Sequence, residues 1–265
     1  MSTRANSPKS DKSSQPATET TAPEETKALP EQTESAPGTA EAQPETQPQQ
    51  PDTYPERIGG IAETGQYERL ISQMLFSGPD QHYMLAVTSA ASGEGVTTTA
   101  VELGIALAQS TTKTVAIVDA NLHRPALHTA FSAALQPGLR ELIAEISSHN
   151  WEPGFAQSAE WVRGFLRTNL PNLWVLPSGC PVGNPSQLMT SEAAEFAMRS
   201  ISVRFDYVVL DCPPILSSVE AGMLCRLADG VAIVVRAGLT PREDVGRARH
   251  MLEGARVTGV ILNGV

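Results

Sequence analysis

The chain has 265 residues, of which 18% are charged and 41% hydrophobic, and its formal net charge is −10. That length and composition fit one globular domain together with an unusually polar segment. Because the chain is acidic and has no cluster of Lys and Arg, a phosphate backbone would repel it, and we do not expect it to bind nucleic acid.

The polar segment is the N-terminal one. Residues 1–56 lack Val, Ile, Phe, Trp and Cys, and they carry ten acidic against four basic residues. Such a sequence cannot bury enough apolar surface to offset the entropy lost on ordering. We therefore divide the chain into a disordered Pro-, Glu- and Thr-rich tail, residues 1–57, and a folded domain, residues 58–265. We interpret the tail as a solvated spacer, with a binding segment as the alternative.

Membrane insertion and cysteine chemistry find little support in the sequence. No segment has an apolar run of the length that a signal peptide or a membrane span needs, which favours a cytoplasmic protein. The three cysteines, Cys180, Cys212 and Cys225, are widely spaced. This spacing suggests neither a disulfide framework nor a zinc site, and we interpret all three as buried free thiols.

Beyond the tail, helical and strand-like segments alternate. The spacing of Leu70, Met74 and Leu75 predicts a first helix within 67–76. Segments rich in Val, Ile and Leu predict buried strands at residues 83–90, 111–119, 173–179, 205–214, 230–238 and 257–263. The region 147–167 is irregular, with one expected helix. Strands that are apolar on both faces and separated by helices indicate an α/β fold, a parallel sheet with helices on both faces.

Residues able to do chemistry gather at the carboxyl ends of these strands, where α/β sheets bind ligands. After the first strand, a Gly-Glu-Gly turn leads into a helix, so that backbone N–H groups and the positive end of the helix dipole face a bound phosphate. The predicted cofactor-binding residues are Gly93, Glu94, Gly95, Thr97 and Thr98. The alternative is that the two glycines only make a tight turn.

The loop departs twice from the pattern G-x-x-x-x-G-K-[S/T], with Ala90 at the first glycine position and Val96 at the lysine position. Two strand-end carboxylates nevertheless favour nucleotide binding, because such groups orient Mg²⁺ directly or through water. A lone strand-end Asp is more often a cap or a turn former, but two beside such a loop are harder to explain in that way. We therefore predict ATP or ADP with Mg²⁺ as cofactors, and Thr97, Asp119 and Asp211 as the Mg²⁺ ligands.

Several runs together resemble, in order and spacing, the bacterial tyrosine (BY) kinases and their separately encoded capsule-synthesis relatives, over roughly residues 65–265. The runs are VTSAASGEGVTTTA, VAIVDANLHRP, PNLWVLPSGCPVGNPSQLMTSE, RFDYVVLDCPPIL and LADGVAIVVRAG, followed by GVILN. The resemblance implies a P-loop NTPase-like fold with ATP and Mg²⁺ on the loop. It also implies autophosphorylation of a C-terminal tyrosine cluster, and a partner that is a membrane polysaccharide co-polymerase or a chain-length or export protein.

Some positions that the resemblance marks as catalytic are degenerate in this sequence. Both strand-end aspartates, Asp119 and Asp211, are kept, but Val96 stands for the loop lysine and Asn121 for the second aspartate of a D-x-D pair. Val cannot give the charge-assisted hydrogen bond of a lysine, about 1.5–3 kcal/mol. Asn lacks the charge that accepts a hydroxyl proton. An arginine such as Arg124 is a candidate for partial compensation.

Further departures point the same way. His123 stands where an arginine often occurs, and the charged pattern of the family's subunit-docking helix is replaced by Gly65, Glu68 and Ile71, so that ring assembly is not expected. No tyrosine follows the last predicted strand, so we expect no autophosphorylation tail. The only lysine beyond the tail is Lys113, which precedes the second strand and is expected at the opposite, amino end of the sheet.

These departures together predict a pseudokinase, a catalytically degenerate regulator or scaffold of exopolysaccharide or capsule production, held at the inner face of the membrane through its partner. The alternative is an active protein-tyrosine autokinase or ATPase whose loop works without a lysine. A third class, the positioning ATPases that share this sheet, is disfavoured by the D-C-P-P and G-N-P-x-Q elements and by the missing lysine.

Overall fold

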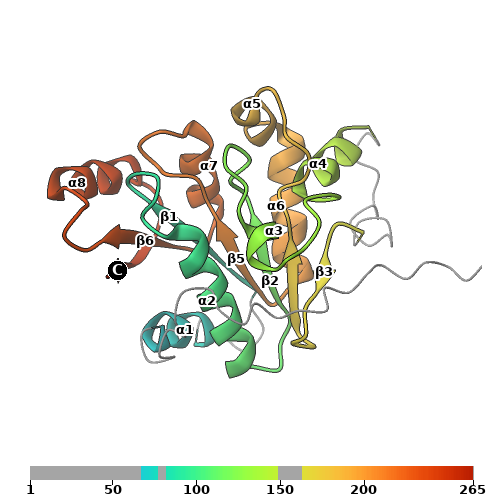
Figure 1. The fold of residues 1–265 in the computed structure, drawn as a ribbon, viewed down its shortest axis with the longest axis horizontal. Helices are drawn as coiled ribbons and strands as arrows, with labels where there is room; N and C mark the ends of the chain where they lie inside the picture. The colour runs from blue at the N-terminus through green and yellow to red at the C-terminus, as the bar shows by residue number, and fades with distance from the viewer. Residues whose placement is uncertain (1–66, 77–81, 149–162, 265) are drawn as a thin grey trace, which may run out of the picture. The chain divides into compact units, whose positions relative to one another are not determined.

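The computed structural model describes residues 67–76, 82–148 and 163–264, and the predicted tail and most of the irregular region 147–167 lie outside them. Helices and strands alternate along the chain (Figure 1). The helices are α1 (Glu68–Leu75), α2 (Val96–Ser110), α3 (Leu127–Ala130), α4 (Leu139–Ser148), α5 (Pro185–Met189), α6 (Glu192–Arg204), α7 (Val219–Leu227) and α8 (Arg242–Met251). The strands are β1 (Tyr83–Ser89), β2 (Val115–Asp119), β3 (Leu166–Arg167), β4 (Leu173–Leu176), β5 (Tyr207–Asp211), β6 (Gly230–Arg236) and β7 (Val257–Asn263).

The strands form one sheet in the order β3-β4-β2-β5-β1-β6-β7. All neighbouring strands are parallel except β3 and β4, which are antiparallel. The six predicted strands are all present, and the predicted parallel sheet is confirmed. The two-residue strand β3 was not predicted, because a segment that short carries no periodic pattern.

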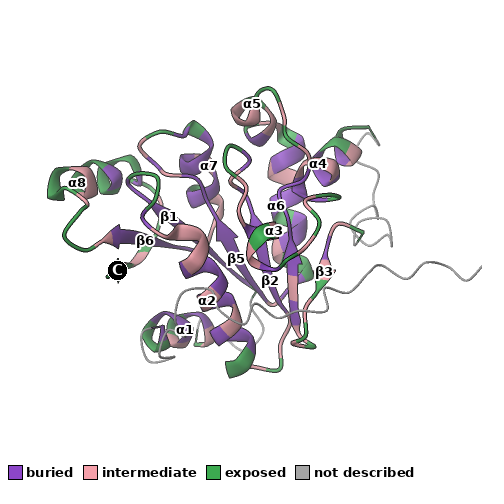
Figure 2. Ribbon diagram, in the orientation of Figure 1, coloured by how far each residue is buried: buried purple, intermediate pink, exposed green. Residues whose placement is uncertain are grey.

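Helices cover both faces of the sheet, as predicted. One apolar cluster packs α1, α2 and α3 against side chains of the sheet such as Leu85 and Ile117. A second cluster packs α4, α6, α7 and α8 against the opposite face, where Ala86 and Val118 point. Figure 2 shows the central strands buried between these layers. Among the described residues, no helix is both long and apolar enough to cross a bilayer.

Close packing of α2 against the sheet depends on a small residue. Gly104 faces β2, where an added Cβ would lie 2.5 Å from the side chain of Ile117. On either side of it, Leu103 and Leu107 are fully buried, and burial of each such side chain contributes about 1.5–3 kcal/mol. The helix that follows the phosphate loop is therefore fixed tightly to the sheet.

Two predictions about burial were partly wrong. Strand β7 is not buried on both faces, because Val260 is 53% and Leu262 70% exposed. It is an edge strand, paired only with β6 among the described residues. Of the three thiols, Cys212 and Cys225 are buried free thiols, as predicted, but Cys180 is only partly buried.

Candidate functional site

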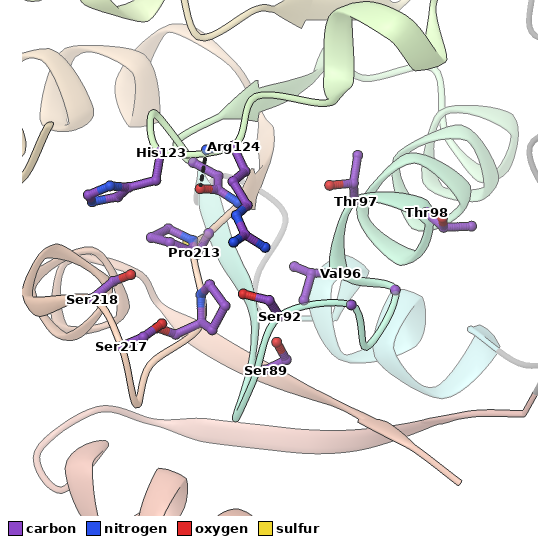
Figure 3. A pocket seen from close by; sticks show the side chains of 15 residues that line it. Ser89, Ser92, Val96, Thr97, Thr98, His123, Arg124, Pro213, Ser217 and Ser218 are labelled. Carbon is purple, nitrogen blue, oxygen red and sulfur yellow. Dashed lines mark hydrogen bonds between the residues drawn. The ribbon is translucent and has the colours of Figure 1, made fainter. Parts of the chain in front are cut away.

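A cavity of about 470 Å³ opens at the carboxyl ends of β1, β2 and β5 (Figure 3). That volume lies in the range of small-molecule sites. Its wall comes from three loops that are distant in the sequence. The lining residues are Ser89, Ser92, Gly93, Gly95, Val96, Thr97, Thr98, Asn121, His123, Arg124, Cys212, Pro213, Pro214, Ser217 and Ser218.

The loop between β1 and α2 presents its backbone to this cavity. Gly93 and Gly95 have φ of 83° and 91°, values that favour glycine over any residue with a Cβ. Gly95 is the N-cap of α2 and has no side chain to cap the helix. The first N–H groups of an α-helix have no acceptor within the helix, so those of α2 remain available for an anion. Thr97 and Thr98 lie on the same wall.

Glu94 does not line the cavity but holds the loop from behind. Its side chain is buried, and its Oε2 accepts hydrogen bonds from the N–H groups of Ala90 (3.0 Å) and Ala91 (3.3 Å). The hydroxyl of Thr240, after β6, donates to its other oxygen. Asn263, at the end of β7, donates from Nδ2 to the Glu94 carbonyl oxygen at 3.0 Å. Only the backbone of Glu94, which was predicted to bind the cofactor, remains available for that role.

Asp119 ends β2 and organises the loop that follows it. Its Oδ1 accepts from the N–H of Asn121 at 3.1 Å, and its Oδ2 from the N–H groups of Ala126 and Leu127, both at 3.1 Å. The side chain is fully buried. Burial raises the pKa of Asp119 to about 6, although the three N–H donors act in the opposite direction.

Asp211, at the end of β5, is fully buried like Asp119 and pairs with it in register on the neighbouring strand. Neither of its carboxylate oxygens has a hydrogen-bond partner among the described residues. Burial, followed by the charge of Asp119, raises its pKa well above the ordinary value. The hydroxyl of Thr97 acts against this shift, but it does not reach hydrogen-bond geometry.

The predicted Mg²⁺ site fits these residues at one position. A buried carboxylate without partners is costly, and a divalent cation would supply the missing partner. Asp211 has this character, and the hydroxyl of Thr97 lies on the cavity wall close to it. Asp119 fits less well as a direct ligand, because its oxygens already accept three N–H groups. No cluster of three or more His, Cys, Asp or Glu side chains surrounds a cation position in the described part of the chain.

Three positions that the sequence analysis singled out lie where they were predicted. Val96 is on the cavity wall and packs partly into the apolar cluster around α2. Asn121 is also on the wall, and its Oδ1 accepts the N–H of Arg124 at 3.2 Å. Lys113 is far from both, since its Nζ lies 5.9 Å from the ring centroid of Tyr207 at the start of β5. The amino end of the sheet was the predicted place for this lysine.

A buried carboxylate beside the cavity was missed by the sequence analysis. Glu220, in the first turn of α7, is 1% exposed, and its Oε1 lies 2.5 Å from Nε2 of His123. The contact has ion-pair distance but not hydrogen-bond alignment. Its Oε2 accepts a hydrogen bond of 2.9 Å from Ser186 in α5. The contacts of Glu220 thereby join the loop after β2, α5 and α7. The signal in the sequence was an acidic residue in the first turn of a helix that is mostly apolar.

Arg124 is the basic side chain that points into the cavity. Figure 3 shows its guanidinium group reaching toward Ser92 and Val96, while the ring of His123 points away from these two residues. No carboxylate pairs with this guanidinium group among the described residues. The cavity therefore combines backbone N–H groups, hydroxyl groups and one permanent positive charge.

Comparison with protein families gives a match over most of the described residues. The model described as an AAA domain matches residues 83–248. The chain is 32% identical over 202 residues to the tyrosine-protein kinase YwqD of Bacillus subtilis. The matched region covers 75% of this chain and 80% of YwqD. It is also 32% identical over 206 residues to the tyrosine-protein kinase CpsD of Streptococcus agalactiae, covering 77% and 84%.

Among solved structures, the kinase domain of VpsO superposes on this fold with a TM-score of 0.65. The two sequences are 26% identical, and the match covers 76% of this chain and 94% of that domain. The similarity thus extends over nearly the whole of that kinase domain.

Proposed function

The chain belongs to the family of bacterial tyrosine-protein kinases, and from this premise we propose that it binds a nucleotide but has lost the kinase reaction. In this proposal it acts as a regulator or scaffold of exopolysaccharide or capsule production. The observation that carries the proposal is Val96, which lies on the cavity wall where the loop pattern requires a lysine. A valine side chain cannot stabilise the charge that develops on a transferred phosphoryl group.

Nucleotide binding is supported by what the cavity retains. The open first turn of α2 and the glycines of the loop suit the phosphates of ATP or ADP. We propose that Gly93, Gly95, Thr97 and Thr98 bind the nucleotide through the loop, with the backbone of Glu94, and that Thr97 and Asp211 hold Mg²⁺, with Asp119 behind them. When bound, Mg²⁺ would neutralise phosphate charge.

Loss of turnover is supported by Asn121 as well as Val96. The side chain of Asn121 accepts the N–H of Arg124 and so forms part of the turn after β2. As a neutral amide it cannot take the proton of an attacking hydroxyl. The lysine position of the loop and the second aspartate position of the D-x-D pair are therefore both occupied by side chains that carry no charge.

The second candidate function is an active autokinase or ATPase without the lysine. It is favoured by one observation, the guanidinium group of Arg124 inside the cavity. Backbone N–H groups and an arginine are adequate for holding phosphates. They leave the attacking hydroxyl without a base, which is why we place this function second.

Assembly and location are proposed from the family. We propose a membrane polysaccharide co-polymerase or a chain-length or export protein as the partner, a cytoplasmic location beside that partner, and residues 1–57 as a spacer. Ring assembly through α1 is not proposed. Ile71 is buried against the chain's own core and Glu68 is exposed, while Gly65 lies outside the described residues.

The proposal is tested by two measurements on the full-length chain. Calorimetric titration with ADP and ATP, with and without Mg²⁺, should show binding. Incubation with ATP and Mg²⁺ should give no phosphotyrosine on the chain or on an added Tyr-containing peptide, with the tyrosine-protein kinase YwqD run in parallel as the positive control. ATP-dependent phosphotyrosine that disappears in Asp211→Asn would establish the second candidate instead.

A further inference from the structure

The cavity is poor in positive charge. Its lining contains two basic side chains, His123 and Arg124, and only Arg124 carries a permanent charge. The guanidinium of Arg236 donates from Nη1 to the carbonyl oxygen of Gly93 at 3.5 Å, but Arg236 does not line the cavity. The phosphates of a nucleotide carry several negative charges, and the loop itself can stabilise them only through its backbone dipoles.

The side chain of Arg124 is placed to meet that charge. Its guanidinium group crosses the cavity from the loop after β2 toward Ser92 and Val96 of the phosphate loop (Figure 3). It has no carboxylate partner among the described residues, so binding an anion would break no existing ion pair. A guanidinium group can donate two parallel hydrogen bonds to a phosphate.

The backbone that carries Arg124 is held in place from three sides. The N–H of Arg124 donates to Oδ1 of Asn121 at 3.2 Å, and Asp119 accepts the N–H groups on either side of this turn. The neighbouring residue, His123, contacts the buried carboxylate of Glu220. Little backbone entropy is therefore lost when the guanidinium group engages a ligand.

We propose that Arg124 binds the terminal phosphate of the nucleotide from the wall opposite the loop, and supplies the positive charge that Val96 cannot. This inference rests on the proposed nucleotide site. It also assigns a positioning role to Asn121, because the side-chain oxygen of Asn121 accepts the N–H of Arg124 in the turn that directs the arginine side chain. The phosphates nearer the sugar would be held by the loop N–H groups.

The test is a set of ATP affinities measured by calorimetry on the full-length chain in the presence of Mg²⁺. Arg124→Ala should weaken ATP binding by about 10- to 100-fold, the equivalent of one charge-assisted hydrogen bond. Arg124→Lys should lose less, because it keeps the charge but not the paired donors. Binding of AMP, which lacks the terminal phosphates, should change by less than about threefold. The matched control is Arg204→Ala, an exposed arginine in the last turn of α6 at the amino end of the sheet, which should bind ATP like the wild type.

The decisive variant is the double substitution Val96→Lys with Arg124→Ala. If Arg124 replaces the lysine, Val96→Lys should restore most of the lost affinity, and Arg124→Ala should cost far less in the Val96→Lys background than in the wild type. If the Arg124→Ala protein has the melting temperature of the wild type and binds ATP within twofold of it, the proposed role of Arg124 is wrong, but the proposed nucleotide site is not contradicted. A wild-type chain that binds neither ATP nor ADP at millimolar concentration overturns both.

Discussion

Asp119 and Asp211 are register partners on the neighbouring strands β2 and β5, yet only Asp119 has hydrogen-bond donors for its carboxylate. Both side chains are fully buried. The carboxylate of Asp119 thus fixes the conformation of the loop after β2, whereas that of Asp211 is available to a ligand.

The same substitution should have different effects at the two positions. Asp211→Asn removes a buried charge without a partner, and should raise the free energy of unfolding of the ligand-free protein by about 1–3 kcal/mol. Asp119→Asn should bring no such gain, because its NH₂ group must face at least one N–H donor, and the lost hydrogen bond of about 1–3 kcal/mol offsets the relief of charge. Urea denaturation of both variants checks this. Equal stabilisation by the two substitutions would contradict the hydrogen-bond assignment.

The ligand-free protein should become more stable as the pH falls from 7.5 to 5.5. The pKa of Asp119 is raised to about 6 and that of Asp211 is raised well above its ordinary value. The folded state therefore binds protons more tightly than the unfolded state, so the contribution of these groups to stability is greatest below their ordinary pKa and is lost as the pH rises through the folded values. Glu141 and Asp206 have lowered pKa values, and their stabilising contribution declines only at lower pH.

Thermal melts in EDTA across this range measure the effect, at about 2–4 °C for each kcal/mol. The rise in Tm on acidification should be smaller in Asp211→Asn, which lacks one of the two groups. A Tm that falls steadily from pH 7.5 to 5.5 would show that the two carboxylates are not protonated more readily in the folded state.

Removal of Mg²⁺ should weaken ADP binding only when Asp211 is present. In the wild type, EDTA should reduce ADP affinity by about tenfold, because Mg²⁺ neutralises both the phosphates and the unpaired carboxylate. In Asp211→Asn the affinities with Mg²⁺ and with EDTA should agree within about twofold. Calorimetry gives both affinities. If Mg²⁺ strengthens ADP binding as much in Asp211→Asn as in the wild type, residues other than Asp211 hold the cation.

The phosphate loop should tolerate no side chain at residue 95. A Cβ on Gly95 would lie 2.0 Å from Nδ2 of Asn263, and φ at this residue is +91°. Gly238 is the matched control, since its φ of +75° is also left-handed but an added Cβ would meet nothing within 4 Å. Gly238→Ala should cost about 1–2 kcal/mol from backbone strain alone, and Gly95→Ala more than this.

Adding Asn263→Ala to Gly95→Ala removes the clash but not the strain, so the double variant should recover part of the lost stability. Chemical denaturation of the single and double variants measures the recovery. If Gly95→Ala is no worse than Gly238→Ala, the contact between Asn263 and the loop does not restrict this position.

The sequence was sufficient for the fold and for the prediction that polar residues gather at the carboxyl ends of the strands. Continuous apolar segments predicted six strands, and the carboxylates at the ends of two of them lie side by side as expected. Strand β3 was missed because two residues show no period, and β7 was assigned two buried faces because its composition resembles that of the inner strands. Position in the sheet, which composition does not encode, decides how much of an apolar strand is covered.

The sequence did not show which polar atoms are satisfied. Asp119 and Asp211 look alike as strand-end acids, and their difference depends on where the backbone of the next loop turns. Glu94 looked like a ligand-facing loop residue, but its carboxylate faces inward to the N–H of Ala90. The direction of the Arg124 side chain, likewise, follows from hydrogen bonds between residues that are not adjacent in the sequence.

The strand order also has a consequence for how the chain reaches its folded state. Strands β1 and β2, which carry the phosphate loop and Asp119, are not neighbours, and β5 lies between them with Tyr207 paired to both Tyr83 and Val115. The two halves of the cavity therefore cannot meet until residues 207–211 have been synthesised and inserted. Such long-range pairing is slow to form. Nucleotide binding would therefore appear only late in folding. A nascent chain that ends before β5 would have no nucleotide site.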